Sequence, residues 1–303
     1  MNHGRILVTG ASGMIGSATV DALLSRGYEV IGIDRRESHR EAQAYQHFVM
    51  DLGDARGLKQ LVSDCNVDRV IHLAALAHTA KGESFSPEEY HYFNVECAQN
   101  VFSAAGDKPV LFISTVDVYG FTKEVVDGNS PVHPVSSYAI SKVHAEEICR
   151  TLPHYTILRF SPVYTPSIKR DIQKRYYLKY PKIAYRIGKG TEYEILDIRN
   201  AVAEILMWCE KEPENDIRVI KDSQRMHTAD YIRKEKSQGR ASIVIPVPRW
   251  IVKFGYNILK LFIGKRPVVY LLHKAVYPLR SSSIAGDHIQ NRDVEHEEKN
   301  SRS

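Results

Sequence analysis

The stretch RILVTGASGMIG, residues 5–16, decides the fold because an apolar run ends in three evenly spaced glycines. Gly10, Gly13 and Gly16 follow a predicted strand and open a predicted helix. Glycines permit a tight turn and a close backbone approach, and the free N–H groups of a helix N-terminus attract phosphate. The pattern predicts a loop that binds the pyrophosphate of a dinucleotide; a glycine-rich turn without a ligand is the alternative.

Apolar, β-branched segments alternate with helical segments over the first 160 residues. The predicted strands cover 5–10, 28–34, 69–75, 109–115 and 155–160, and helical segments between them include 17–27 and 95–106. This alternation predicts βαβ units with right-handed crossovers. The expected fold class is therefore α/β, with a doubly wound parallel sheet covered by helices on both faces.

The alternation weakens in the second half of the chain, although residues 195–211 read as a strand end followed by an amphipathic helix. We predict a nucleotide-binding domain over 1–165. A smaller substrate-binding region with late sheet elements follows over 166–286. Residues 287–303 contain almost no apolar side chains and are predicted to be a disordered tail.

The composition is that of an ordinary globular protein, with 43% hydrophobic and 25% charged residues. A net charge of +5 suits phosphorylated small molecules or an anionic surface, but it is too small to indicate nucleic acid as a partner. The four cysteines lack metal-ligand spacing, which indicates reduced thiols and no metal site. The N-terminus leaves no room for a signal peptide, and no apolar run reaches about 18 residues, so we expect a cytoplasmic protein.

Asp34 ends the second predicted strand. An acidic residue at this point accepts hydrogen bonds from the adenosine ribose, which favours NAD. Arg35 and Arg36 follow directly, and arginines here can bind the 2′-phosphate of NADP. NAD is favoured because the Asp34 carboxylate would repel that phosphate, and NADP stays open as the alternative.

SSYAISK, residues 136–142, sets Tyr138 and Lys142 one helical turn apart on the same side of a predicted helix. A cation about 4 Å from a phenol is worth about 4 kcal/mol at an effective dielectric constant of 20, which lowers the phenol pKa by roughly three. Thr115 ends a predicted strand, where open α/β sheets bind ligands, and its hydroxyl can steady a developing alkoxide. Taken alone, Tyr138 and Lys142 read as an exposed helix pair and Thr115 as a structural hydroxyl.

Taken together, these motifs resemble the extended short-chain dehydrogenases/reductases of the nucleotide-sugar epimerase/dehydratase type. The matching segments span about the first 165 residues: TGASGMIG (9–16), Asp51-Leu52, HLAA (72–75), FNV (93–95), ISTVDVYG (113–120), YAISK (138–142) and RFSPVY (159–164). The resemblance implies a Rossmann-like domain, a C-terminal region that binds a nucleotide sugar, and a homodimer formed through a four-helix interface that includes the Tyr138 helix.

The resemblance also assigns roles to individual residues. It implies catalytic roles for Thr115, Tyr138 and Lys142, and it puts Asn94 on a helix behind the active site. Residues of the glycine loop, of the acidic strand end and of the nicotinamide side complete the predicted cofactor site. The predicted cofactor-binding residues are Gly10, Ser12, Gly13, Met14, Ile15, Gly16, Asp34, Arg35, Asp51, Leu52, Ala74, Ala75, Tyr138 and Lys142.

The residues after Thr115 bear on the reaction. Dehydratases of the family carry an acid pair there, whereas this chain has Val116 and Asp117. We therefore favour 4-epimerisation of a nucleotide sugar, ahead of ketoreduction or dehydrogenation and of 4,6-dehydration; Asp117 reads equally well as a solvated loop acid. A chain that binds NAD(H) without catalysis, as a scaffold or sensor, is the alternative of another class. His72 is predicted to be a buried strand histidine without a chemical role.

The loop after residue 160 departs from the family pattern, with Pro162 in place of an asparagine and Thr165 in place of a glycine. Arg175, Arg186 and Arg218 are candidates for diphosphate contacts, although the favoured interpretation of each is a surface arginine.

The segment RWIVKFGYNILKLFIGK, residues 249–265, combines apolar residues with one narrow polar stripe. Arg249, Lys253, Asn257 and Lys260 recur at helical spacing and form that stripe. One interpretation is a helix packed on the core of the substrate-binding region. The other is a helix that lies on the inner face of a membrane, where basic and aromatic residues are favoured.

Overall fold

The structure is a computed structural model that describes residues 4–77, 85–165, 170–178, 183–264 and 266–282. The chain forms two compact units, and each is assembled from separate stretches of sequence. The first consists of Met1–Val118, Ser136–Arg159 and Ala201–Arg218, and the second of Tyr119–Val135, Phe160–Asn200 and Val219–Ser303. The functional division predicted at residue 165 stays a prediction, and the predicted tail lies outside the described residues.

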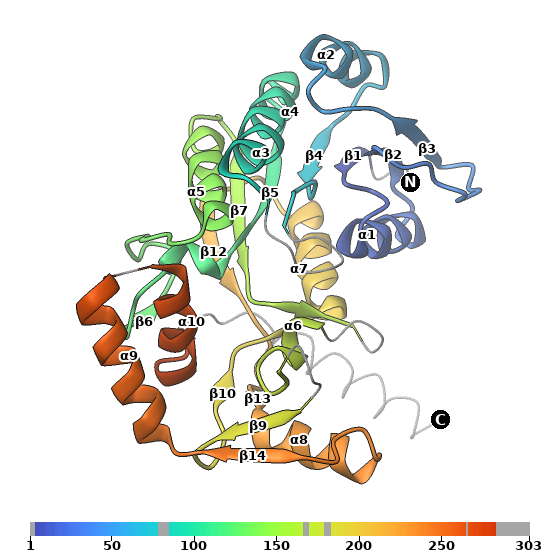
Figure 1. The fold of residues 1–303 in the computed structure, drawn as a ribbon. Coiled ribbons are helices and arrows are strands. Elements are labelled where there is room, and N and C mark those ends of the chain that lie inside the picture. Colours follow the sequence, from blue (N-terminus) through green and yellow to red (C-terminus); the bar gives the residue numbers. More distant parts are fainter. Residues whose placement is uncertain (1–3, 78–84, 166–169, 179–182, 265, 283–303) are drawn as a thin grey trace. The chain divides into compact units, whose positions relative to one another are not determined.

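A seven-stranded sheet with the order β12-β7-β5-β4-β1-β2-β3 is the framework of the fold (Figure 1). The strands are β1 (Arg5–Thr9), β2 (Glu29–Asp34), β3 (Tyr45–Val49), β4 (Arg69–His72), β5 (Val110–Thr115), β7 (Tyr155–Phe160) and β12 (Asp216–Ile220). The strands from β3 to β5 pair in parallel, with Leu7 of β1 opposite Ile31 and Val70. The order reverses between β1 and β4, and open α/β sheets bind ligands at such a switch point.

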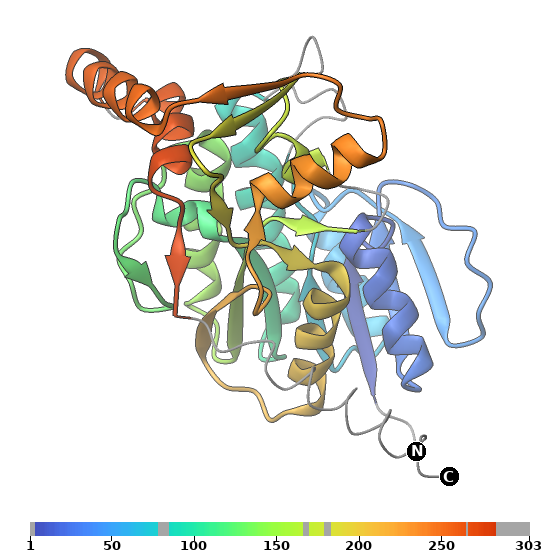
Figure 2. The same cartoon turned by 90° about the horizontal axis from the view of Figure 1, so that it is seen from below.

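Helices cover both faces of this sheet (Figures 1 and 2). One face carries α2 (Ala55–Asp64), α4 (Cys97–Ala105) and α5 (Ser137–Cys149), and the other carries α1 (Met14–Ser25) and α7 (Ile198–Glu210). The predicted doubly wound α/β fold is therefore confirmed.

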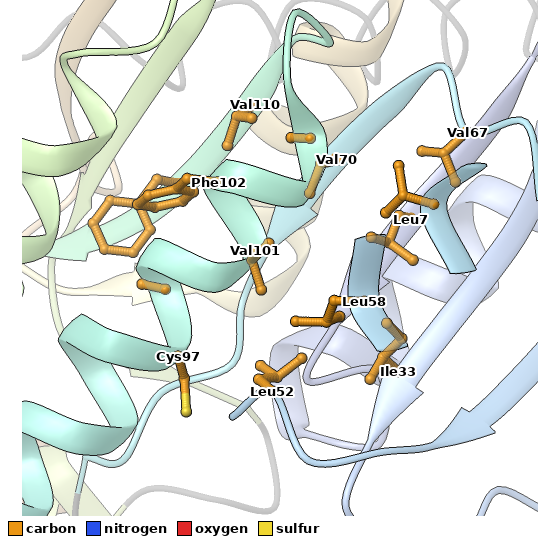
Figure 3. Close-up of a cluster of buried hydrophobic side chains, with 14 of the residues drawn as sticks. Leu7, Ile33, Leu52, Leu58, Val67, Val70, Cys97, Val101, Phe102 and Val110 are labelled. Atoms are coloured by element: carbon orange, nitrogen blue, oxygen red, sulfur yellow. The ribbon is translucent and has the colours of Figure 1, made fainter. Parts of the chain in front are cut away.

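The main core lies between the sheet and helices α2 and α4 (Figure 3). Leu7 and Ile33 from the strands meet Leu58 of α2, while Phe102 of α4 packs edge-on against Phe112 of β5 at a centroid distance of 5.5 Å. Side chains of this size lose most of their water contact here, which supplies the apolar burial that holds helices to sheet.

One ion pair is buried in the same unit, between α5 and β7. Arg159 donates from Nε and Nη2 to Glu146, at 3.1 and 2.7 Å, and both side chains are almost fully buried. A bidentate arginine–carboxylate pair is the geometry that tolerates burial best, because each charge satisfies the other. It fixes the helix that carries Tyr138 and Lys142 to the sheet.

The second unit is built from short strand pairs and helices. Its elements are β6 (Val125–Val126), β8 (Val163–Tyr164), α6 (Arg170–Gln173), β9 (Ala184–Ile187), β10 (Glu192–Tyr193), β11 (Leu196–Asp197), β13 (Met226–His227), α8 (Thr228–Ser237), β14 (Val244–Val247), α9 (Arg249–Ile263), α10 (Pro267–Val276) and β15 (Arg280–Ser281). The pairs are β10–β13, β11–β8, β14–β9 and β15–β6. A small core around Tyr176 and Ile195 holds this unit together.

We expect Glu146→Gln to lower the free energy of unfolding by about 3–5 kcal/mol, because it removes the carboxylate charge that faces the buried Arg159 guanidinium. Urea unfolding followed by circular dichroism measures this loss. The matched control is Glu147→Gln, since residue 147 is the exposed neighbour on the same helix. Equal stability of the two variants would contradict the importance of the buried pair.

Candidate functional site

The glycine loop between β1 and α1 is held in a form that only glycine permits. Gly10 has a φ of +71°, and a Cβ atom on Gly16 would lie 2.0 Å from the carbonyl oxygen of Gly10. Any side chain at residue 16 would therefore push the first turn of α1 away from β1. The amides of Gly10 and Ala11 donate to the carbonyl of Ile33, at 2.8 and 3.2 Å, and tie the loop to the end of β2.

The start of α1 is prepared for an anion. Its N-cap is Gly13, which has no capping side chain, and its first turn contains no acidic residue. The first N–H groups of the helix therefore point outward without an intrahelical partner. The Ser12 hydroxyl is buried and has no hydrogen-bond partner within the described ranges. These groups fit a pyrophosphate.

A cavity of about 270 Å³ opens beside this loop within the first unit. Its walls come from the carboxyl ends of β2, β3 and β4 and from the helices that follow. The lining residues are Gly10, Gly13, Ile33, Asp34, Arg35, Arg36, Met50, Asp51, Leu52, Leu73, Ala74, Ala75, Leu76, Phe93 and Cys97. Eight of the predicted cofactor residues are in this wall, while Ser12, Met14, Ile15 and Gly16 form the adjoining loop and the first turn of α1.

Asp34 is fixed between the loop and the residues that follow it. Its Oδ2 accepts from the Ser12 amide at 3.1 Å, and its Oδ1 accepts from the Arg36 amide at 3.0 Å. Arg36 also donates to the Ser12 carbonyl at 2.8 Å, and the Arg35 guanidinium lies 4.6 Å from the centre of the Phe93 ring. Both arginines thus have partners, and the carboxylate is held at the cavity wall.

Several wall residues were not predicted from sequence, namely Ile33, Met50, Leu73, Leu76, Phe93 and Cys97. Burial, followed by the nearby Asp51 carboxylate, raises the pKa of the Cys97 thiol to about 11, so this thiol stays neutral and acts as an apolar wall. Two signals were present in the sequence: Met50 precedes the Asp51-Leu52 pair, and Cys97 lies one turn after Phe93.

Asn94 links the cavity wall to helix α5. It lies in a π-helical turn, η1 (Tyr92–Glu96), between α3 (Pro87–His91) and α4. Its side chain accepts from the Leu76 amide at 2.7 Å, donates to the Leu76 carbonyl at 2.9 Å and donates to the Ser141 hydroxyl at 2.9 Å. Single π-turns are frequent at functional sites, and this one allows one amide to hold both the loop after β4 and α5.

Helix α5 presents Tyr138 in its first turn. The Ser136 side chain caps the helix by accepting from the Ala139 amide at 3.1 Å. Ser141 donates to the Tyr138 carbonyl at 2.8 Å, and the Tyr90 ring lies 6.0 Å from the Tyr138 ring. The phenol is half-buried on a helix whose start is fixed by its cap and whose next turn is fixed by Asn94.

Lys142 follows one turn later and is almost fully buried. Its Nζ lies 4.0 Å from the centre of the Phe112 ring on β5. Burial lowers the pKa of Lys142 to about 7, although the Glu146 carboxylate acts in the opposite direction. The amino group of Lys142 can thus gain or lose a proton near neutral pH.

His72 at the end of β4 is buried, as predicted. Its Nδ1 lies 2.7 Å from the Thr9 hydroxyl, and its ring stacks on Phe112 at 5.7 Å. Burial, together with the charge of Lys142, lowers its pKa to about 3, so the ring is neutral. The Thr9 hydroxyl also accepts from the Ala74 amide at 3.3 Å, which explains why β4 ends at His72 instead of continuing to residue 75.

Thr115 ends β5, at the carboxyl edge of the sheet, and a 3₁₀ turn, η2 (Val116–Tyr119), follows it. The Asp117 amide donates to the Thr115 hydroxyl at 3.2 Å. Val116, at the position of the first acid in dehydratases of the resembled family, is an apolar residue that is only 6% exposed. This buried side chain offers no group for proton transfer.

The three arginines considered for diphosphate contacts have different surroundings. Arg218 of β12 forms ion pairs with Glu204 and Asp216. Arg175 lies 4.6 Å from the centre of the Tyr193 ring, and Arg186 of β9 is exposed. Among the described residues, no cluster of histidine, cysteine or carboxylate side chains is arranged to hold a metal ion.

A sequence model of the NAD dependent epimerase/dehydratase family matches residues 6–229, about three quarters of the chain. The chain belongs to this family. The family assignment confirms the predicted resemblance, and a family that depends on NAD agrees with the predicted cofactor.

Two of the curated proteins that are similar to this chain are named as 4-epimerases. UDP-glucose 4-epimerase 2 of Arabidopsis thaliana is 32% identical over 163 residues, covering 48% of this chain and 46% of the relative. The N-acetyl-alpha-D-glucosaminyl-diphospho-ditrans,octacis-undecaprenol 4-epimerase of Escherichia coli O157:H7 is 27% identical over 219 residues, covering 67% and 62%. The match thus spans about half to two thirds of the length of these curated relatives.

Among solved structures, the UDP-glucuronic acid 4-epimerase of Bacillus cereus, in complex with NAD, superimposes with a TM-score of 0.67. It is 25% identical, and the match covers 81% of this chain and 87% of that one. The likeness extends beyond the matched family segment and supports the same doubly wound fold.

The buried Lys142 predicts a pH dependence of stability. Its folded-state pKa of about 7 lies below its ordinary value of 10.5, so between these two pH values the unfolded chain holds a proton that the folded chain has released. The contribution of this group to the free energy of unfolding should rise with pH across that window, by at most about 1.4 kcal/mol per pH unit.

Urea unfolding of the wild type and of Lys142→Met at pH 7, 8 and 9 isolates this contribution, because the other titrating groups cancel in the difference. The wild type minus variant difference should increase with pH. A difference that is constant over these pH values would mean that Lys142 stays charged in the folded protein.

Proposed function

We propose that this protein is an NAD-dependent nucleotide-sugar 4-epimerase. The observation that carries the proposal is that two features occur in one unit. One is the cavity beside the glycine loop, with Asp34 in its wall, and the other is the helix that bears Tyr138 and Lys142. The family membership and the names of the relatives support it. We further propose that the predicted cofactor-binding residues hold the dinucleotide, with Asp34 at the adenosine ribose and the start of α1 at the pyrophosphate.

In this proposal the chain's own residues transfer one proton between the substrate and Tyr138. Tyr138 removes the proton from the C4 hydroxyl of the sugar and returns it after the 4-keto sugar has turned its other face. Bound NAD supplies the chemistry of accepting and returning the hydride. Thr115 holds the substrate oxygen by a hydrogen bond, and a protonated Lys142 stabilises the phenolate of Tyr138.

The near-neutral pKa of Lys142 gives this assignment a physical basis. A lysine that is buried against Phe112 gains stability from any anionic group that comes close to it. Ionisation of Tyr138 one turn away would provide such a group, so the two side chains favour each other's charged forms. The buried Glu146, paired with Arg159, biases Lys142 towards the protonated form from the other side.

Epimerisation is proposed ahead of 4,6-dehydration because the apolar, buried Val116 stands where a dehydratase needs its first acid. Ketoreduction or dehydrogenation would use the same three residues with a cofactor that exchanges after each turnover. Tightly held NAD in the purified protein would favour the epimerase, since that reaction regenerates its cofactor in each cycle.

A second candidate substrate is a sugar linked to a polyprenyl diphosphate. The relative from Escherichia coli is named for such a substrate. The exposed apolar side chains of α9 favour it, because a lipid-linked sugar is presented at a membrane surface. Comparison of turnover on a UDP-sugar with turnover on the same sugar as a lipid diphosphate in micelles decides between the two.

We also propose a cytoplasmic homodimer that serves polysaccharide biosynthesis. Exposed residues recur with helical spacing on α4 and α5, among them Gln99, Ser103, Ile140 and His144, and such faces suit a four-helix interface. None of the helices in the described ranges has both the length and the hydropathy that a membrane crossing requires. Sedimentation at micromolar concentration tests the dimer, and a monomer would contradict it.

We expect Tyr138→Phe to lower turnover by about 10²- to 10⁴-fold while NAD stays bound, because the phenyl ring keeps the shape of the site and loses the proton-transfer group. The assay is a screen of UDP-, GDP- and dTDP-sugars, with the stereochemistry of the product read by NMR. Tyr90→Phe is the matched control, since its hydroxyl donates to the Ala77 carbonyl 3.0 Å away beside the same helix.

Retained turnover in Tyr138→Phe would contradict the assigned proton transfer. A wild type that holds NAD but converts no nucleotide sugar would instead support the scaffold or sensor alternative.

A further inference from the structure

Helices α9 and α10 form a hairpin whose outer side is strongly apolar. Figures 1 and 2 show the two helices side by side. Seven large apolar side chains of α9 are exposed, with Leu261 at 81%, Phe262 at 78% and Trp250 at 69%, and six of the seven share one side of the helix. The six are Trp250, Ile251, Phe254, Ile258, Leu261 and Phe262, and Val268 and Leu271 of α10 add to them. Exposed apolar groups in this number on one element mark an interaction surface.

The 100° rotation per residue divides α9 into three sectors. Val252, Tyr256 and Leu259 share the inner sector, which packs in the small core of the hairpin. The six exposed apolar residues named above share the opposite sector, the outer sector of the hairpin, and Lys253 and Lys260 lie along the boundary between the two sectors. The exposed apolar sector is therefore distinct from the sector that folds the hairpin.

The hairpin is anchored from its inner side. His273 of α10 lies 2.8 Å from the Thr122 carbonyl through Nε2 and 3.2 Å from the Tyr256 hydroxyl through Nδ1. Phe121 packs against Tyr270 and His273, with centroid distances of 5.2 and 5.1 Å. These contacts hold the hairpin on its own unit, so substitutions on the outer sector can be made without removing the contacts that fold it.

The charge of this region is one-sided. Residues 236–286 contain nine lysines and arginines and no aspartate or glutamate, which leaves the rest of the chain net negative. Two lysines are on the α9 boundary, and Lys274 of α10 lies 4.4 Å from the Tyr270 ring. Arg266 occupies the N-cap position of α10 and is exposed. A basic rim beside an apolar, aromatic sector is the arrangement that binds an anionic lipid interface.

We propose that the outer sector of the α9–α10 hairpin docks on an anionic membrane surface, with α9 lying in the plane of the interface. The apolar side chains, Trp250 included, enter the boundary between headgroups and acyl chains, and the lysines and Arg266 meet lipid phosphates. This inference does not rest on the epimerase proposal, because it concerns a surface of the second unit and its test measures binding.

Charge favours a bilayer over two alternative occupants of the outer sector, a second copy of the chain and the chain's own residues 287–303. A second copy would bring an equally basic surface with no acidic residue to pair with it. The C-terminal residues 287–303 are acidic, but they contain almost no apolar side chains to cover the exposed sector. An anionic membrane surface offers both a negative charge and an apolar layer.

Flotation of the full-length protein with phosphatidylglycerol/phosphatidylcholine vesicles, and with phosphatidylcholine vesicles alone, tests the proposal. We expect binding to the anionic vesicles that weakens as salt rises, because salt screens the basic rim. The chain has two tryptophans, and Trp208 is buried, so a blue shift of emission and quenching by brominated lipid report on Trp250.

Two double variants separate the two contributions. Leu261→Ser with Phe262→Ser removes the most exposed apolar groups, and Lys253→Glu with Lys260→Glu reverses the basic boundary. Each should lower vesicle affinity by at least about tenfold. Matched controls are Val125→Ser, an exposed apolar residue of β6, and Lys59→Glu with Lys211→Glu, which makes the same change of net charge in the first unit.

Binding that both double variants lose and both controls retain supports the proposal. Failure of the wild type to float with anionic vesicles overturns it, whatever its activity on soluble nucleotide sugars. Equal binding to neutral vesicles overturns the part assigned to the basic rim. Conversion of a dimer to a monomer by Leu261→Ser with Phe262→Ser, without vesicle binding by the wild type, would assign the sector to a second copy.

Discussion

The close approach of Gly16 to the Gly10 carbonyl is the constraint on which the first unit depends. Because a Cβ atom would lie 2.0 Å from that oxygen, only glycine lets α1 begin directly above the end of β1. The same approach leaves the first turn of α1 uncapped and holds Ser12 within hydrogen-bond distance of Asp34. Local sterics thus produce both an uncapped helix start that suits an anion and the position of Asp34, the acid that we propose binds the ribose.

A second constraint concerns α5, the proposed catalytic helix, which is tied to neighbouring elements and carries the buried side chains of Lys142 and Glu146. Asn94 ties α5 to the loop after β4, and the Glu146–Arg159 pair ties it to β7. Burial of Lys142 against Phe112 costs stability, and that cost is smallest when an anion is near the ammonium. A lysine held in this state contributes most when a phenolate forms beside it, which is the event that the proposed chemistry requires.

Much of the first unit could be predicted from the sequence, because its signals are local. The strand alternation predicted the α/β fold, and the glycines, Asp34 and the Asp51-Leu52 pair predicted most of the polar cavity wall. Strand β3 was not predicted, since YQHFV alternates weakly and gains its place by pairing with β2. Phe93, Cys97 and the burial of Lys142 depend on contacts between distant segments. For α9, the sequence showed the stripe, but not which side of the helix packs inward.

The most direct test of the central claim follows the hydride through a complete turnover. The protein as purified, without added nucleotide, is given the nucleotide sugar that it converts in the screen, carrying deuterium at C4, and the product is read by NMR and mass spectrometry. We predict the C4 epimer with deuterium retained at C4, because the hydride returns to the carbon from which it came. Loss of the label, or a product that forms only with stoichiometric added cofactor, would contradict the account.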